Sequence, residues 1–297
     1  MVVHTLLHVV RGFAMGAGNI VPGVSGGTIA LVFGIYERLI ASVRAGSKAL
    51  TLLVRGDTAG FRDWMKAVEW SFLIPLGIGM LVSVVALASL LQTYLEEQPQ
   101  HMAALFTGLV VGSVVVAWWL LRRPGIVHLA VIVAVGVTTF LLLGIRGGAD
   151  EESVGQAVDP GLLAFFIAGL IAISAMILPG ISGSFLLVIM GMYAPVLSAV
   201  TDRQVFELSI FMLGAVVGLA ALSQILHAAL QRWHDLVLAA LIGLMAGSVR
   251  VLWPWPGGVD SIELALPSGD AVDTLASLAV AVAAFLLVLV VARYAQG

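Results

Sequence analysis

Residues 22–36 read PGVSGGTIALVFGIY, and residues 179–193 read PGISGSFLLVIMGMY. The two copies lie 157 residues apart, align without a gap and are identical at six of fifteen positions. Each copy lies inside a hydrophobic segment of about forty residues. A Pro-Gly pair ends a helix, because proline lacks an amide N–H and glycine loses the most backbone entropy. The pattern therefore predicts two helix breaks at equivalent places.

The composition indicates that these breaks lie in a membrane. Apolar residues make up 61% of the chain and charged residues 10%, and the apolar runs approach the ~20 residues that a helix needs to cross a bilayer. We therefore expect an integral membrane protein with a single membrane domain, residues 1–297. Apolar segments are expected at about 4–43, 70–91, 101–121, 125–145, 160–200, 207–229, 236–252 and 272–292.

Missing residue types exclude several kinds of site. The chain has no cysteine, which excludes disulfides, thiol nucleophiles and cysteine-bound metals. The six histidines lack the spacing of a metal-ligand set, so we expect no metal and no other cofactor. The N-terminus lacks the basic cluster of a signal peptide and is expected to be retained. We expect membrane lipids and no nucleic acid as partners, and the sequence leaves open whether the chain forms a homo-oligomer.

Basic residues concentrate in alternate loops. The loop at 37–69 carries six of them, and Arg122, Arg123, Arg232 and Arg293 follow at later segment ends. Acidic residues fall mostly in the loops between. Because cytoplasmic loops of membrane proteins are rich in Lys and Arg, we expect both termini in the cytoplasm. Each long segment that contains a motif must then return to the side from which it entered.

Such a segment is either a re-entrant hairpin or a pair of full crossings. The stretch from Val24 to Glu37 has 14 residues, about 21 Å as a helix, which is less than the ~30 Å of a hydrocarbon core. No charged residue accompanies either Pro-Gly turn. We therefore favour re-entrant hairpins.

A fainter repeat links the rest of the two halves. Residues 108–113 read GLVVGS and residues 243–248 read GLMAGS, each with a tryptophan five residues later. Each half, about 4–145 and about 160–292, is thus expected to hold one hairpin and three crossings, and an odd number inverts the second half. The predicted fold is an all-α polytopic membrane protein with an inverted-topology repeat, two re-entrant helical hairpins and six transmembrane helices.

Each break exposes the start of a helix. The first amides of a helix lack partners within it, and unsatisfied donors are costly in a bilayer. Together with the helix dipole and nearby hydroxyls, these amides suit an oxyanion such as phosphate. The candidate substrate-binding residues are Pro22, Gly23, Ser25, Gly26, Gly27, Thr28, Pro179, Gly180, Ser182, Gly183 and Ser184. The alternative is that the serines only cap helices and the glycines only pack against neighbouring helices.

Two arginines within apolar segments extend this candidate site. Arg11 lies one helix arm before the first break, and Arg250 lies near the end of a later apolar segment. A charge in such a place is expensive, and a guanidinium pairs well with phosphate. We therefore add Arg11 and Arg250 to the candidate contacts, with snorkelling to an interface as the alternative. Glu37 aligns with Ala194, so we interpret it as an interfacial charge rather than a proton carrier.

At these motifs the chain resembles the PopT-type polyprenyl-phosphate transporters, also catalogued as domain of unknown function 368. The resemblance rests on residues 22–28 (PGVSGGT) with 34–37 (GIYE), on residues 175–184 (AMILPGISGS) and on residues 247–254 (GSVRVLWP). It covers nearly the whole chain. It implies a flippase of the bacterial plasma membrane that returns undecaprenyl phosphate from the outer to the inner leaflet. It also implies that both Pro-Gly-x-Ser-Gly turns and Arg250 contact the headgroup.

The second motif has Ser184 in place of Gly27 and Phe185 in place of Thr28, so the two half-sites need not contribute equally. Polyprenyl-pyrophosphate phosphatases share a Pro-Gly-x-Ser signature, but they place an arginine after the serine where this chain has glycine. A small-anion carrier would use the same site without a lipid tail. Among these alternatives we expect a transporter that works by alternating access at a midplane phosphate site, and not an enzyme.

Overall fold

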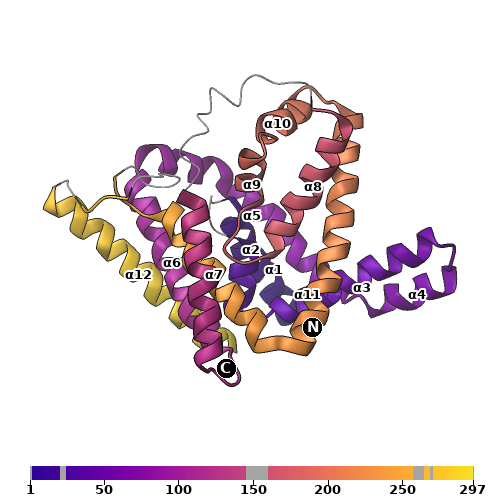
Figure 1. Ribbon diagram of the computed structural model, residues 1–297, viewed down its shortest axis with the longest axis horizontal. Coiled ribbons are helices and arrows are strands. Elements are labelled where there is room, and N and C mark those ends of the chain that lie inside the picture. Colours follow the sequence, from indigo (N-terminus) through magenta and orange to yellow (C-terminus); the bar gives the residue numbers. More distant parts are fainter. Residues whose placement is uncertain (1, 21–24, 145–159, 257–263, 268–269, 297) are drawn as a thin grey trace.

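The computed structural model describes residues 2–20, 25–144, 160–256, 264–267 and 270–296. These ranges contain helices and no strands (Figure 1), which confirms the predicted all-α class. The helices are α1 (Val2–Ile20), α2 (Gly26–Val32), α3 (Tyr36–Val54), α4 (Thr58–Ala67), α5 (Trp70–Glu97), α6 (Pro99–Trp119), α7 (Ile126–Gly144), α8 (Leu162–Ile177), α9 (Gly183–Ile189), α10 (Tyr193–Thr201), α11 (Val205–Ser248), the 3-10 helix η2 (Val249–Leu252) and α12 (Ala271–Gln296).

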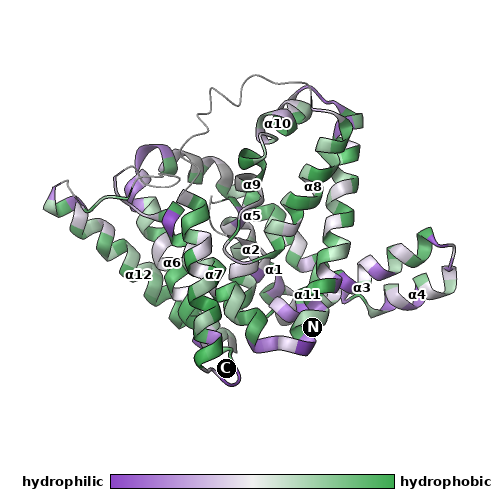
Figure 2. Ribbon diagram, in the orientation of Figure 1, coloured by the Kyte–Doolittle hydropathy of each residue, from purple (hydrophilic) through white to green (hydrophobic). Residues whose placement is uncertain are grey.

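Five of the described helices are long and apolar enough to cross a membrane. They are α5, α6, α7, α11 continued by η2, and α12, and they confirm a membrane protein. The predicted segments 207–229 and 236–252 lie on either side of Trp233, whose non-helical backbone (φ −135°, ψ 48°) divides α11 at a kink into two helical parts, and the second segment ends in η2. Figure 2 shows hydrophobic residues along most helices, with hydrophilic residues at helix ends and in α3 and α4.

Each motif segment folds as a helix, a break and a second, short helix. α1 ends at Ile20 and α2 begins after Ser25, while α8 ends at Ile177 and α9 begins after Ser182. In the second break Gly180 has φ +82°, a conformation that only glycine adopts without strain. An extended residue, Ser25 or Ser182, therefore precedes a short helix at equivalent places, and Pro22 and Gly23 of the first predicted break lie outside the described residues.

The helix after each break is shorter than the sequence indicated. The expectation of one 14-residue arm is wrong, because a turn at Gly34 (φ +65°) follows α2. The N–H of Ile35 donates to the carbonyl oxygen of Ala30 at 2.9 Å, as in the Schellman ending that glycine favours. Gly191 (φ +67°) ends α9 with the equivalent hydrogen bonds. The third shared glycine of each motif thus terminates a helix.

The long helices pack in pairs through small residues. α1 lies along α5, α8 along α11, α6 along α12, and α7 along α11. A Cβ added to Gly12 would lie 2.0 Å from the carbonyl oxygen of Leu76, and one added to Gly169 would lie 2.0 Å from that of Phe211. Glycine therefore lets these backbones meet, as in other membrane helix pairs. In Figure 1, α2 and α9 lie between α6 and α7 on one side and α8 and α11 on the other.

Candidate functional site

The two motifs meet in the folded chain. The Ser25 hydroxyl donates to the carbonyl oxygen of Met176 at 3.0 Å, and the Tyr36 hydroxyl donates to that of Ile177 at 3.2 Å. The Thr28 hydroxyl accepts from the N–H of Gly180 at 3.1 Å. Side chains of the first motif therefore satisfy backbone groups that the second break removes from helical hydrogen bonding.

Protein groups also hold the first amides of α2. Ser25 has the extended backbone of an N-cap residue (φ −125°, ψ 143°), and its hydroxyl oxygen accepts from the N–H of Gly27 at 3.1 Å. Asn19, at the end of α1, accepts from the N–H of Gly26 through Oδ1 at 2.6 Å. The expectation that these two amides face a ligand is therefore wrong for this conformation, and the capping alternative describes Ser25.

The start of α9 is built differently. Ser182 has a similar extended backbone (φ −95°, ψ 132°) but makes no side-chain capping hydrogen bond. Gly180 lies against α11, where an added Cβ would be 2.7 Å from the Cα of Met245. Gly183 lies against α8, 2.6 Å from the Ala172 carbonyl oxygen by the same measure. These two glycines therefore serve close backbone packing.

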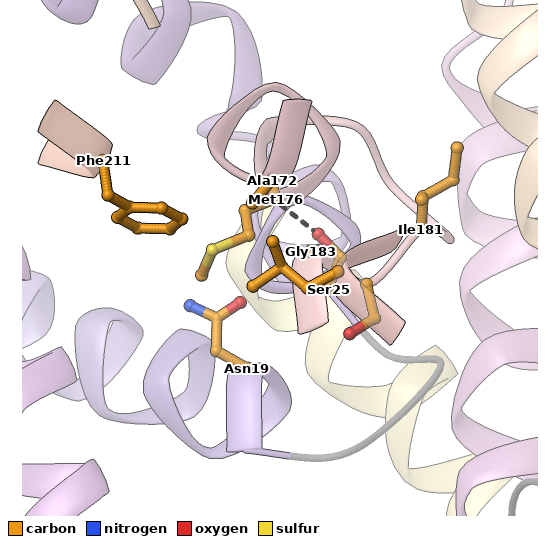
Figure 3. Close-up of a pocket in the computed structure, with 9 residues that line it drawn as sticks. Asn19, Ser25, Ala172, Met176, Ile181, Gly183 and Phe211 are labelled. Atoms are coloured by element: carbon orange, nitrogen blue, oxygen red, sulfur yellow. Dashed lines mark hydrogen bonds between the residues drawn. The ribbon is translucent and has the colours of Figure 1, made fainter. Parts of the chain in front are cut away.

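A cavity of about 230 Å³ lies between the two motifs (Figure 3). Its polar groups belong to Asn19, Ser25 and Ser182, and its remaining wall is mostly apolar. Figure 3 shows Asn19 and Ser25 beside Met176 and Gly183. The lining residues are Asn19, Ser25, Ala172, Met176, Ile181, Ser182, Gly183, Leu187 and Phe211. A small polar group could therefore enter a pocket whose walls suit an apolar neighbour.

The predicted site residues divide into three groups. Ser25, Ser182 and Gly183 line the cavity. Gly26, Gly27, Thr28, Pro179 and Gly180 are buried beside it. Pro22, Gly23 and the side chain of Ser184 lie outside the described residues.

Arg11 and Arg250 do not line this cavity. The Cζ atom of Arg11 lies 6.0 Å from the centre of the Phe33 ring, and Arg11 precedes Asn19 by eight residues, about 12 Å of helix. The Cζ atom of Arg250 lies 4.8 Å from the centre of the Phe140 ring, on α7. Direct contact between either arginine and a ligand in the cavity would require a rearrangement.

Asn19 is a polar residue that the sequence reasoning missed. It lies seven residues before Gly26, at the end of an apolar helix, so its contact with α2 forms only because the chain turns back at the break. The available signal was a single carboxamide next to the first Pro-Gly pair. Such a side chain can accept from one helix start and still present its amide donors elsewhere.

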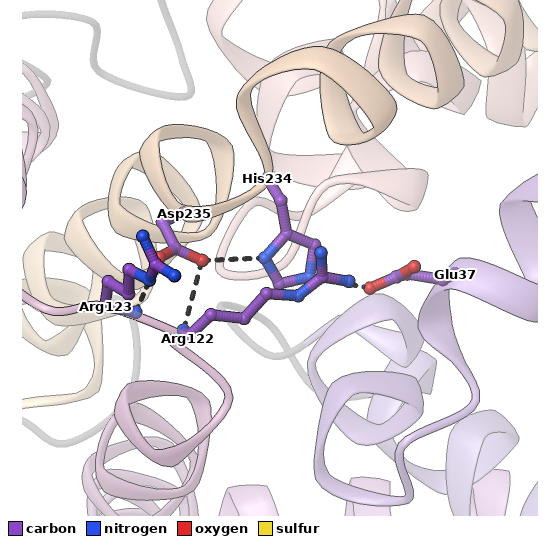
Figure 4. A network of polar contacts seen from close by, with 5 residues as sticks. All are labelled: Glu37, Arg122, Arg123, His234 and Asp235. Atoms are coloured by element: carbon purple, nitrogen blue, oxygen red, sulfur yellow. Dashed lines mark hydrogen bonds and ion pairs between the residues drawn. The ribbon is translucent and has the colours of Figure 1, made fainter.

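A second group of polar residues joins three parts of the chain (Figure 4). His234, just after the kink of α11, contacts the Glu37 carboxylate through Nε2 and the Asp235 carboxylate through Nδ1, each at 2.8 Å. The Asp235 carboxylate also accepts from the backbone N–H groups of Arg122 and Arg123 at 3.1 and 2.9 Å. The start of α3, the kink of α11 and the α6–α7 turn are therefore tied together.

Comparisons with known proteins agree with the motifs. Residues 15–265 match the model of the VCA0040-like family, described as undecaprenyl phosphate translocase-like. The chain is 39% identical over 253 residues to a Vibrio cholerae protein named polyprenyl-phosphate transporter, covering 82% of this chain and 76% of that protein. It is 30% identical over 265 residues to a Staphylococcus aureus protein of the same name, covering 84% and 86%. No solved structure matches the chain significantly.

Proposed function

The chain belongs to the VCA0040-like, undecaprenyl phosphate translocase-like family, and we propose that it returns undecaprenyl phosphate from the outer to the inner leaflet of the bacterial plasma membrane. In this role the protein is a transporter and not an enzyme. The lipid phosphate cannot cross hydrocarbon unaided, because removing its charge from water is strongly unfavourable. The protein must therefore offer polar groups at depth while the polyprenyl tail stays in lipid.

The observation that carries this proposal is the meeting of the two motifs around one cavity. The Asn19 amide and the Ser182 hydroxyl lie there and can replace part of the water around a phosphate, while the Ser25 hydroxyl holds the cavity wall by its bonds to Met176 and Gly27. The apolar wall, which includes Met176 and Phe211, suits the first part of an isoprenoid tail. We therefore place the phosphate at the Asn19 and Ser182 end of the cavity.

Equivalent helix contacts within each half support an inverted repeat as the frame of this site. The approach of Gly12 to Leu76 has its counterpart in that of Gly169 to Phe211. The helices after the breaks, α2 and α9, have seven residues each, about 10 Å, far less than a hydrocarbon core. We propose repeats at about 4–145 and 160–292 within one domain, each with a re-entrant hairpin and three membrane helices.

Basic residues at one end of the molecule support cytoplasmic termini. The contacts of Asp235 and His234 bring the Arg122–Arg123 turn next to the start of α3, which leads into the basic loop at 37–69. With this end in the cytoplasm, the two repeats would rock about the cavity and open it to each leaflet in turn. Arg11 and Arg250 would then meet the phosphate only in another conformation.

The proposal is tested by replacing the cavity serines. We expect Ser25→Ala and Ser182→Ala to raise surface-exposed undecaprenyl phosphate several-fold in cells without a redundant transporter. Ser182→Ala removes a hydroxyl from the cavity, and Ser25→Ala removes the side chain that joins Gly27 and Met176 at the cavity wall. Ser209→Ala is the matched control, since Ser209 is exposed on α11 and bonds only within its helix among the described contacts. Unchanged recycling at normal protein levels in both variants would reject the headgroup role. Release of inorganic phosphate from the pyrophosphate lipid by the purified protein would instead indicate an enzyme.

A further inference from the structure

The hairpin of α3 and α4 projects sideways from the rest of the molecule. In Figure 1 it extends away from the lower part of α11, across the direction in which α8 and the upper part of α11 run. α4 packs on α3 and has no buried residue. A helix of ten residues is marginal in water unless tertiary contacts support it. An additional contact that covers the hairpin is therefore expected.

The far half of α3 exposes an apolar stripe. Leu50, Leu53 and Val54 are all exposed, and Val54 retains 82% of its accessible surface. Residues spaced by three and four lie on one face of a helix. The stripe ends at the hairpin tip, where Gly56 (φ +79°) turns the chain towards α4. This face is suited to an apolar environment, and the described part of the chain leaves it uncovered.

The same hairpin is basic. Residues 38–66 contain six Lys or Arg and two Asp. Asp57 caps α4, accepting from the N–H of Gly60 at 2.8 Å, so its charge is placed at a helix N-terminus. Arg62 and Lys66 are exposed on α4 and share a face at a spacing of four. The exposed surface of the hairpin is therefore positively charged as well as apolar.

Two cations stabilise the hairpin itself. The Lys48 ammonium lies 4.2 Å from the centre of the Trp64 ring, and the Arg44 Cζ atom lies 5.7 Å from it. These cation–π contacts join α3 to α4. They leave Arg62 and Lys66 on the outer surface, where they can meet anions.

The position, charge and exposed apolar surface of the hairpin together indicate what it contacts. The hairpin starts at Glu37, which contacts His234 beside the Arg122–Arg123 turn, so it leaves from the basic end of a membrane protein. Helices with one apolar face and many cations lie in the interface of a bilayer, where anionic headgroups attract them. We infer that the α3–α4 hairpin is a membrane-surface anchor that inserts Leu50, Leu53 and Val54 between anionic phospholipids. This anchor is independent of the transported lipid.

The absence of native cysteine allows a direct test with single spin labels. The full-length variants Val54→Cys and Asp63→Cys are labelled and reconstituted into vesicles of phosphatidylcholine, or of phosphatidylcholine mixed equally with phosphatidylglycerol. Collisions with oxygen report lipid contact, and collisions with a water-soluble nickel chelate report water contact. We expect an oxygen-to-nickel ratio several-fold higher at position 54 than at the exposed position 63 in the mixed vesicles. Two changes should lower the oxygen-to-nickel ratio of the Val54→Cys variant. One is the addition of Arg62→Gln and Lys66→Gln, and the other is reconstitution into vesicles of phosphatidylcholine alone.

Each other outcome overturns the inference in a distinct way. An equally low ratio at both positions places the apolar stripe in water. Rare collisions of the position 54 label with both reagents indicate a protein partner, such as a second copy of the chain. If the ratio at position 54 is high but changes with neither the charge substitutions nor the lipid composition, anionic phospholipids are not what the hairpin binds.

Discussion

The starts of α2 and α9 occupy equivalent positions in two copies of one motif, yet their amides are held differently. At α2, Asn19 and Ser25 accept from the N–H groups of Gly26 and Gly27. At α9, Ser182 makes no side-chain capping bond. The position equivalent to Asn19 is Met176, whose thioether is only a weak acceptor. Side chains thus accept from the first two amides of α2, whereas the Ser182 side chain does not cap α9.

The other hydroxyls of the motifs also form more contacts in the first copy than in the second. Thr28 and Tyr36 of the first copy bond the backbone of the second. Their counterparts are Phe185, which has no hydroxyl, and Tyr193, which is exposed. The first copy therefore acts as a support that holds the second break in place. Equivalent places in a repeated motif do not imply identical roles, and we expect the second copy to lie closer to the ligand.

The largest effect is expected from the turn that the first copy supports. Gly180→Ala should destabilise the protein by about 2–5 kcal/mol, because it adds a side chain at positive φ and forces it against α11. The contact would be with the Cα of Met245, 2.7 Å from the added Cβ. Thermal unfolding of the purified protein in detergent measures this loss. Gly77→Ala is the control, since no atom lies within 4 Å of its added Cβ, and an equal loss in both variants would contradict the prediction.

The next effect tests the support directly. Thr28→Val removes the acceptor of the Gly180 N–H while keeping the side-chain shape, so a buried donor loses its partner. We expect a loss of about 1–3 kcal/mol in unfolding free energy. Thr201→Val, at an exposed position whose hydroxyl bonds within its own helix turn, should have little effect. If Thr28→Val is as stable as the parent protein, the first motif does not hold the second.

Asn19 provides a smaller and more specific comparison. Asn19→Leu should cost about 0.5–2 kcal/mol, as the loss of an N-cap acceptor does, because the Gly26 N–H then has no carboxamide to accept it. Asn19→Asp keeps an acceptor at the same place and should retain most of the stability. The same unfolding measurement on both variants separates capping from simple packing, since packing alone predicts similar losses.

Local chemistry made part of this architecture predictable. Membrane spans and two breaks follow from apolar run length and from the Pro-Gly pairs, which act within a few residues. The contacts of Asn19 with Gly26 and of His234 with Glu37 were not predictable, because they depend on where the chain returns in space. The rotation of each helix about its axis was equally undetermined. That is why Arg250 faces Phe140, although its segment also suited a place beside the breaks.

The smallest effect concerns the Glu37–His234 contact, which only the first copy of the motif makes. Glu37 follows the first motif and contacts His234, whereas Ala194 follows the second. The Glu37 side chain is 59% exposed, so water screens the pair and Glu37→Gln should cost no more than about 1 kcal/mol. A loss in unfolding free energy several times larger, absent from Glu207→Gln at a partly exposed site on α11, would mean that the Glu37–His234 contact helps the Thr28 and Tyr36 hydroxyls to support the second copy. The support of the second copy would then extend from the cavity to the kink of α11.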